Sequence, residues 1–225
     1  MTNAVVHEIA IPLADGQAVS GLLCMPGAVR AGYVLAHGAG AGMTHPFMTA
    51  VAEQLAERGI ATLRYQFPYM ERGSRRPDPP AIAHAAVRGA VAEAARRLPG
   101  LPLFAGGKSF GGRMTSQAQA EVPLPDIDGL VFLGFPLHPA KRPSLDRARH
   151  LAQVRVPMLF LQGDRDALAE HQLIAEAVAE LGDRATLTIF PDADHSFHVP
   201  ARSGRTDAQV LAAMCDAVAA WMAAR

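Results

Sequence analysis

The sequence has few of the features that mark a secreted, membrane-bound or nucleic-acid-binding protein. Its 225 residues include only two cysteines, Cys24 and Cys215, and the first residues show neither a basic start nor a long apolar run. No apolar stretch approaches the about 20 residues that span a bilayer. Lys and Arg balance Asp and Glu at 21 each, so no overall field attracts nucleic acid or an anionic membrane. We therefore expect a cytoplasmic protein with a small-molecule partner, no nucleic acid and no membrane.

Patterns for binding a metal are also missing. The nine histidines are scattered, and neither H-x-x-x-H nor C-x-x-C spacing occurs. We expect no metal site and no cofactor.

Short apolar runs recur along the chain and have the character of strands buried on both faces. They begin at Tyr33, Ala61, Leu101, Gly129, Val156 and Ala185. Segments with helical spacing of apolar residues separate these runs, which predicts a mostly parallel sheet with helices on both faces. Two earlier runs, 5–11 and 19–25, flank Ala14-Asp15-Gly16 and predict an antiparallel hairpin at one edge. We expect about eight strands in a single α/β domain over residues 1–225.

Polar residues follow the predicted strands at their carboxyl ends, where ligands bind in such sheets. The candidate segments are His37-Gly38-Ala39-Gly40, Gly107-Lys108-Ser109, Gly163-Asp164-Arg165-Asp166 and Asp192-Ala193-Asp194-His195. One edge of the sheet is thereby expected to collect a serine, acids and histidines.

The segment 103–114, LFAGGKSFGGRM, contains a Gly-Lys-Ser that fits two chemistries. A phosphate-binding loop needs G-x-x-x-x-G-K-[ST], but its first glycine position is Pro102, which has no N–H to donate. A G-x-S-x-G nucleophile elbow is satisfied throughout, with glycines two residues before and after Ser109. That motif alone also fits an ordinary strand-to-helix turn. The acid and histidine that follow in the order of a catalytic triad favour the elbow.

The motifs LAHGAG, GGKSFGG, and GDRD with DADHSF resemble those of α/β-hydrolases of the small, lidless, dienelactone-hydrolase-like type, from about residue 18 to the end. RYQFPYMERGSRRPDPP and FPLHP are most similar to a little-characterised bacterial group related to a domain of eukaryotic chromatin-complex subunits. The resemblance implies a single-domain α/β-hydrolase fold. Dienelactone hydrolases proper carry a cysteine at the elbow where this chain has Ser109, so their lactone specificity is not carried over.

Ser109 is the expected nucleophile, and His195 the base that accepts its proton. His198 is a rival for the histidine. For the acid we prefer Asp166 to Asp164, because the pattern G-x-x-D resembles the acid turn of the superfamily.

The oxyanion hole is expected to consist of two backbone N–H groups. One is that of Phe110, which follows the nucleophile, and the other is that of Ala39, with Gly40 as the next choice. Gly40 is also expected to contact the substrate. His37 is expected to brace this loop and to transfer no proton.

The irregular loop 68–80, PYMERGSRRPDPP, is expected to overhang the site. Its Arg72, Arg75 and Arg76 either hold a substrate carboxylate or phosphate or lie in solvent, and Tyr69 and Met70 are expected in the pocket wall. Between Phe135 and Met158 there is room for one short helical stretch near 145–152 but not for a cap domain.

These features predict a serine hydrolase that cleaves carboxylic esters or thioesters of small acyl substrates through an acyl-enzyme. A non-catalytic binding or scaffold domain with the same fold is the alternative from another class. A peptidase is the alternative among enzymes, because amide hydrolysis uses the same triad.

Overall fold

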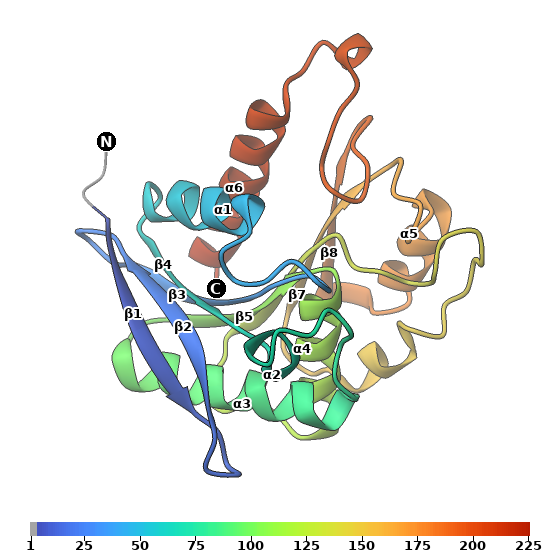
Figure 1. Ribbon diagram of the computed structural model, residues 1–225. Helices are drawn as coiled ribbons and strands as arrows, with labels where there is room; N and C mark the ends of the chain where they lie inside the picture. Colours follow the sequence, from blue (N-terminus) through green and yellow to red (C-terminus); the bar gives the residue numbers. More distant parts are fainter. Residues whose placement is uncertain (1–3) are drawn as a thin grey trace.

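An eight-stranded sheet forms the centre of the structure, a computed structural model that describes residues 4–225 (Figure 1). The strands are β1 (Val5–Pro12), β2 (Ala18–Met25), β3 (Ala31–Ala36), β4 (Ile60–Tyr65), β5 (Leu103–Lys108), β6 (Gly129–Leu133), β7 (Met158–Gly163) and β8 (Ala185–Phe190). They lie in the order β1-β2-β4-β3-β5-β6-β7-β8. β2 is antiparallel to both β1 and β4, and all other pairs are parallel. The prediction of a mostly parallel sheet with a hairpin at one edge is confirmed.

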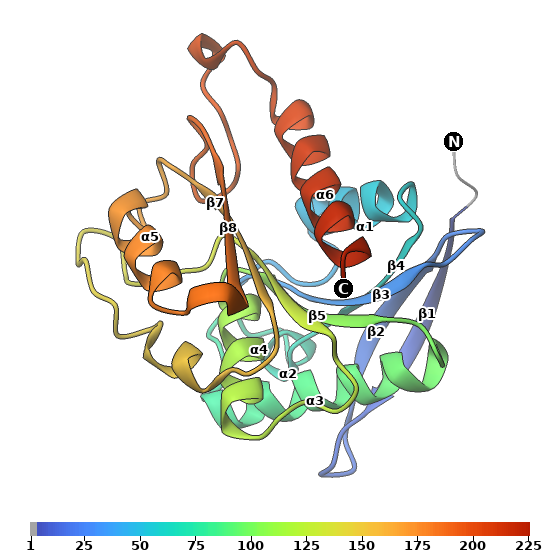
Figure 2. The ribbon, with the colours of Figure 1, turned by 180° about the vertical axis from the view of Figure 1, so that it is seen from behind.

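Helices cover both faces of the sheet, as Figures 1 and 2 show from opposite sides. The helices are α1 (Pro46–Ala56), α2 (Pro68–Glu71), α3 (Pro80–Arg97), α4 (Phe110–Glu121), α5 (His171–Ala179) and α6 (Asp207–Ala223), with 3-10 turns at Arg149–Gln153, Gly182–Arg184 and Ala201–Ser203. Apolar residues of α1 and α6 form one core with one face of the sheet. Those of α3, α4 and α5 form a second core with the other face.

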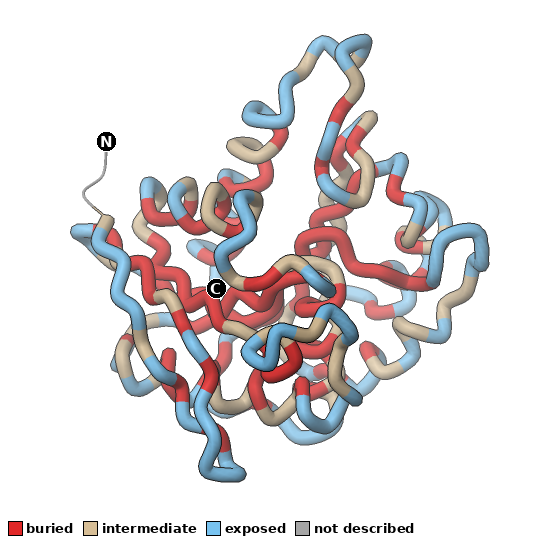
Figure 3. The backbone as a smooth tube through the Cα atoms, in the orientation of Figure 1, coloured by how far each residue is buried: buried red, intermediate tan, exposed pale blue. Residues whose placement is uncertain are grey.

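The burial of each strand explains its sequence. Every residue of β3, β4, β6 and β7 is buried, and these strands are apolar nearly throughout because helices cover both of their faces (Figure 3). In β2 and β1 exposed positions are frequent, because the hairpin lies at the edge. The edge hairpin contributes mainly one buried face, while the central strands position the site.

The register brings the carboxyl ends of distant strands to one level. Ala36 at the end of β3 pairs with Gly107 of β5, and Gly163 at the end of β7 pairs with Phe190 at the end of β8. The loops after β3, β5, β7 and β8 therefore emerge at the same edge of the sheet.

Within residues 4–225 no cap domain interrupts the sheet. The segment 134–157 between β6 and β7 contains one short helical stretch, the 3-10 turn Arg149–Gln153, which overlaps the stretch expected near 145–152. None of the helices described combines the length and apolar character that crossing a membrane requires.

Candidate active site

Ser109 occupies a strained turn between β5 and α4. Its φ is 50° and its ψ −114°, a conformation that a non-glycine residue rarely adopts. The turn is held tightly against β3: a Cβ at Gly107 would lie 2.2 Å from the carbonyl oxygen of Ala36, and one at Gly111 would lie 2.6 Å from it. Only glycine fits at these two positions, so the G-x-S-x-G spacing has a steric cause. The turn leaves the Ser109 hydroxyl at the mouth of a cavity.

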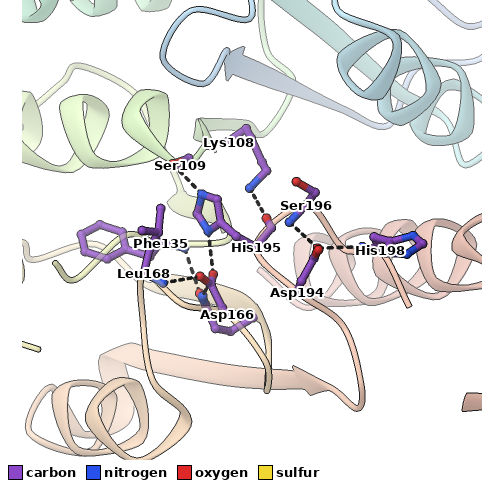
Figure 4. A network of polar contacts seen from close by, with 10 residues as sticks. Lys108, Ser109, Phe135, Asp166, Leu168, Asp194, His195, Ser196 and His198 are labelled. Atoms are coloured by element: carbon purple, nitrogen blue, oxygen red, sulfur yellow. Dashed lines mark hydrogen bonds and ion pairs between the residues drawn. The ribbon is translucent and has the colours of Figure 1, made fainter. Parts of the chain in front are cut away.

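A continuous chain of hydrogen bonds joins Ser109 to a histidine and an aspartate (Figure 4). The Oγ of Ser109 lies 2.8 Å from Nε2 of His195, and Nδ1 of His195 lies 2.6 Å from Oδ2 of Asp166. The side chain of Asp166 is fully buried, and that of His195 is 23% exposed. Because the carboxylate can only accept at Nδ1, the imidazole carries its proton there and leaves Nε2 free to accept from the serine hydroxyl.

Two further groups hold the Asp166 carboxylate in place. Its Oδ1 accepts the backbone N–H of Leu168 at 2.8 Å, and its Oδ2 accepts a short hydrogen bond from Nε2 of Gln162. Gln162 is buried in β7, and its Oε1 accepts the N–H of Phe135 at 2.9 Å. Sequence reasoning missed Gln162, although a glutamine inside the apolar run MLFLQG is a signal that could have found it.

Gly134 makes room for the histidine to cross the sheet. Ser109 follows β5 and His195 follows β8, so the imidazole must pass over the end of β6, where Gly134 has a φ of 71°. A Cβ at Gly134 would lie 2.9 Å from Nζ of Lys108 and 3.5 Å from Cε1 of His195. Sequence reasoning missed this residue too, because its importance depends on the strand order.

Two backbone amides point to an oxyanion hole beside Ser109. The N–H of Phe110 is the first of α4 and has no acceptor within that helix, at the end where the helix dipole favours negative charge. In the loop after β3, the N–H of Gly40 is already donated to Oη of Tyr69 at 3.0 Å, whereas that of Ala39 has no acceptor among the residues described. The geometry therefore favours Ala39 over Gly40.

The comparisons with known proteins agree with this geometry. The model of a family described as "Alpha/beta hydrolase domain" matches residues 29–223. The chain belongs to the α/β-hydrolase family.

Solved structures of small hydrolases share the fold of this α/β hydrolase. It is 23% identical to the dienelactone hydrolase of Anabaena variabilis, with a TM-score of 0.76 over 97% of this chain and 96% of that one. It is 20% identical to XC6422 of Xanthomonas campestris, described as an α/β serine hydrolase without lid, with a TM-score of 0.75 over 96% and 94% of the two chains. A cold-adapted esterase from an Arctic intertidal metagenomic library is 20% identical, with a TM-score of 0.68 over 94% and 92%.

Lys108 is a half-buried cation next to the proposed nucleophile of this α/β hydrolase. Its Nζ donates to the backbone oxygen of His195 at 2.5 Å and lies 6.0 Å and 5.6 Å from the ring centroids of Phe47 and Phe197. Burial lowers the pKa of Lys108 to about 8, although the carboxylates of Asp166 and Asp194 oppose that shift. Lys108 thus ties the histidine loop to the end of β5.

His37 lies in the oxyanion loop and is held as a neutral ring. Its Nδ1 donates to the backbone oxygen of Gly38 at 2.8 Å, and its Nε2 accepts the N–H of Phe67 at 3.2 Å. Burial lowers the pKa of His37 to about 4. The ring braces the loop that carries Ala39.

The rivals for the histidine and the acid point elsewhere. Nδ1 of His198 lies 2.8 Å from Oδ2 of Asp207 at the start of α6, away from Ser109 (Figure 4). Asp164 is exposed, and its backbone N–H donates to Phe190. Neither side chain contacts Ser109 or His195.

Two hollows of about 370 Å³ each meet at Ser109, and both are also lined by Ala39 and Leu168. The first is largely apolar and includes Phe47 and Met48 beside His195. The second runs toward loop 68–80 and the segment 134–157.

The structure places the expected substrate-binding residues of loop 68–80 outside both hollows. Tyr69 is buried in the core, and Met70 is half-buried against it. Arg72 forms an ion pair with Asp78, and Arg75 and Arg76 are exposed. Two arginines that sequence reasoning did not single out, Arg113 and Arg147, line the second hollow instead. The loop covers the site with Pro77, Asp78 and Pro80, not with its cations.

Metal ligands do not gather in the part of the chain that the structure describes. Residues 4–225 contain no group of three or more His, Cys, Asp or Glu side chains arranged to hold a metal ion.

Proposed function

We propose that this α/β hydrolase cleaves carboxylic esters or thioesters of small acyl groups through an acyl-enzyme. The observation that carries the proposal is the unbroken hydrogen-bonded chain from Ser109 through His195 to the buried Asp166. A serine hydroxyl alone is a poor nucleophile, and this chain supplies the base that activates it. The esterase and dienelactone hydrolase among the structural neighbours support the same reaction class.

In the first half of the reaction Ser109 Oγ attacks the acyl carbon while Nε2 of His195 takes its proton. Asp166 stabilises the imidazolium that forms and remains ionised. The N–H groups of Phe110 and Ala39 donate to the oxyanion of the tetrahedral intermediate. His195 then returns the proton to the leaving alcohol or thiol, which leaves the acyl group on Ser109.

In the second half a water molecule takes the place of the leaving group. His195 accepts a proton from the water as it attacks the acyl carbon, and the oxyanion again receives the two backbone N–H groups. Collapse of the intermediate returns the proton to Ser109 Oγ and releases the acid. We place this reaction in the reducing cytoplasm, which fits the two free, buried cysteines.

Covalent labelling tests the proposal. A fluorophosphonate probe is expected to add one mass adduct to the folded protein and none to Ser109→Ala. Ser203→Ala, in the remote turn Ala201–Ser203, is the matched control and is expected to label like the wild type. Ser109→Ala should also lose hydrolysis of short p-nitrophenyl esters. A folded wild-type protein that takes no adduct would favour the scaffold alternative, and faster cleavage of amides than of matched esters would favour a peptidase.

The absence of a cap in residues 4–225 leads to an expectation about chain length. Hollows of about 370 Å³ suit small acyl groups, and with no cap to move there is no reason for activation at a lipid surface. Acetate and butyrate esters are therefore expected to be cleaved faster than palmitate esters. A jump in rate above the solubility limit of the substrate would contradict this expectation.

A further inference from the structure

Two arginines that the proposed reaction does not use lie beside the nucleophile. Arg113 belongs to α4, one turn after Ser109, and Arg147 belongs to the segment between β6 and β7. Both side chains line the second hollow, together with Ser109 and Phe110. Both residues are half-buried.

Neither guanidinium has a partner of opposite charge. Among residues 4–225, no ion pair or hydrogen bond involves the guanidinium of Arg113 or of Arg147, and Nε of Arg113 is buried with no acceptor; the contact of the Arg113 guanidinium is with the ring of Phe110, whose centroid lies 5.9 Å away. Burial lowers the pKa of Arg113, and the positive charge of Arg147 lowers it further, so the two groups repel each other.

The nearby acids form ion pairs with other arginines. Asp146 forms an ion pair with Arg149, not with its neighbour Arg147. Asp78 lines the same hollow and pairs with Arg72 through its Oδ1, while its Oδ2 is buried without a hydrogen-bond partner among the residues described. Two half-buried cations side by side without a counter-ion are costly, and an anion bound between them would relieve that cost.

The position of His195 indicates which part of the substrate carries this anion. His195 lines the first hollow and not the second. Because the leaving group takes its proton from His195, it leaves through the first hollow. The acyl group then extends into the second hollow, past Phe110 and toward Arg113 and Arg147.

We infer that the substrate is an ester or thioester of a short dicarboxylic acid, whose free carboxylate is bound by Arg113 and Arg147. Guanidinium groups suit this role, since each presents paired N–H donors that match a carboxylate. Arg113 follows Ser109 by about one turn of α4 and lines the same hollow, so the carboxylate of a short dicarboxylic acyl chain on Ser109 can reach its guanidinium. This inference rests on the proposed acyl-enzyme reaction.

Three phenyl-type esters, with phenyl acetate as a reference, test the inference. The monophenyl ester of adipic acid carries the carboxylate on the acyl chain, phenyl hexanoate is its neutral match, and 4-acetoxybenzoate carries a carboxylate on the leaving group. We expect kcat/KM for the adipate half-ester to exceed that for phenyl hexanoate at least tenfold. No such gain is expected from the anion of 4-acetoxybenzoate. Preference for 4-acetoxybenzoate over phenyl acetate would place the anion in the wrong hollow and overturn the assignment.

Arginine variants assign the preference to residues. Arg113→Met and Arg147→Met should each lower the ratio of kcat/KM for the half-ester over phenyl hexanoate tenfold or more. Arg149→Met is the matched control, because Arg149 is exposed, paired with Asp146 and outside both hollows; it should leave the ratio unchanged. A ratio that stays at the wild-type value in both variants would refute the inference while the serine-hydrolase proposal stands.

A binding measurement separates failure of the inference from failure of the proposed function. Calorimetry on Ser109→Ala should detect the adipate half-ester, and addition of Arg113→Met should weaken its binding at least tenfold. If the wild type takes no fluorophosphonate adduct but Ser109→Ala binds the half-ester in an Arg113-dependent way, the proposed chemistry fails and the anion site remains. Absence of binding at millimolar half-ester, together with normal labelling, would refute the anion site alone.

Discussion

His195 and His37 both lie at the carboxyl edge of the sheet and both have hydrogen-bonded rings, but only His195 is placed to accept a proton. Each ring nitrogen of both has one partner. His195 faces a carboxylate at Nδ1 and a hydroxyl at Nε2, so a proton can be accepted at Nε2 and the resulting charge is stabilised. His37 faces a carbonyl at Nδ1 and an N–H at Nε2. Protonation of its Nε2 must therefore break the hydrogen bond from the N–H of Phe67 and place a charge in the protein interior. The partners, not the residue type, decide which histidine can act as a base.

The largest effect is expected from removal of the Asp166 carboxylate, which distinguishes the surroundings of His195 from those of His37. Asp166→Asn is expected to lower kcat by about 10⁴, because an amide can donate to Nδ1 and hold the wrong tautomer. Asp164→Asn is the matched control in the same turn and should cost about tenfold or less. Both are measured after circular dichroism shows that each variant is folded. A larger loss at Asp164 than at Asp166 would reverse the assignment of the acid.

A larger side chain at Gly134, beside Lys108 and His195, should have the next largest effect on kcat. Gly134→Ala places a Cβ 2.9 Å from Nζ of Lys108 and strains a residue at φ 71°, so Lys108 must shift, which disturbs its hydrogen bond to the backbone oxygen of His195. Since small displacements of a catalytic group are costly, we expect kcat to fall about 100-fold. Gly204→Ala, also at positive φ but with open space around it, is the control for strain alone and should keep its kcat. Equal losses in the two variants would show that general instability, not the position of His195, is the cause.

Lys108 donates a hydrogen bond to the backbone oxygen of His195, and no lysine does the same for His37 among the residues described. Replacing Lys108 tests what this hydrogen bond contributes to turnover. Lys108→Met keeps the length and the contacts with Phe47 and Phe197 but loses the hydrogen bond to His195, so we expect kcat to fall about tenfold. A second readout is stability. A lysine with a lowered pKa destabilises the fold below pH 8, and this penalty disappears as pH rises from about 8 toward the ordinary value of 10.5.

Chemical denaturation at pH 7 and pH 10 measures the free energy of unfolding of the wild type and of Lys108→Met. The free energy of unfolding of Lys108→Met, relative to the wild type, should therefore decrease between these two pH values. A constant difference would contradict a lowered pKa of Lys108.

The smallest effect on turnover is expected at His37, where stability should respond instead. The unfolded chain takes up a proton near pH 6.5 and the folded one only near pH 4, so the wild type loses stability as pH falls through this window. His37→Gln keeps an acceptor for the N–H of Phe67 but cannot be protonated. Between pH 7 and pH 4 its free energy of unfolding should therefore fall by up to about 3 kcal/mol less than that of the wild type. Its kcat at pH 7 should stay within about threefold.

Denaturation curves of the wild type and His37→Gln at both pH values check this expectation. His150 also has a pKa lowered to about 4 by burial and remains in both proteins, so only the difference between them is informative. Equal acid sensitivity would mean that His37 is not the neutral brace described.

The sequence by itself determined the sheet and the positions of the chemically active residues along it. Apolar runs had to become strands covered on both faces, and strand ends had to carry the polar segments, because burial of those runs allows little else. G-x-S-x-G predicted a strained turn at Ser109 because only glycine tolerates the approach of β3 that the turn requires. These conclusions depend on local pattern, which a single sequence displays.

Only the tertiary structure decided which groups face one another. Gly134 matters because β6 lies between β5 and β7, and Gln162 matters because its amide reaches both Phe135 and Asp166. The loop arginines looked suited to an anion, yet Arg72 pairs with Asp78, while Arg113 and Arg147 from distant segments line the hollow. The direction and partner of a side chain depend on strand order and packing between distant segments, and these are properties of the folded chain that no short stretch of sequence contains.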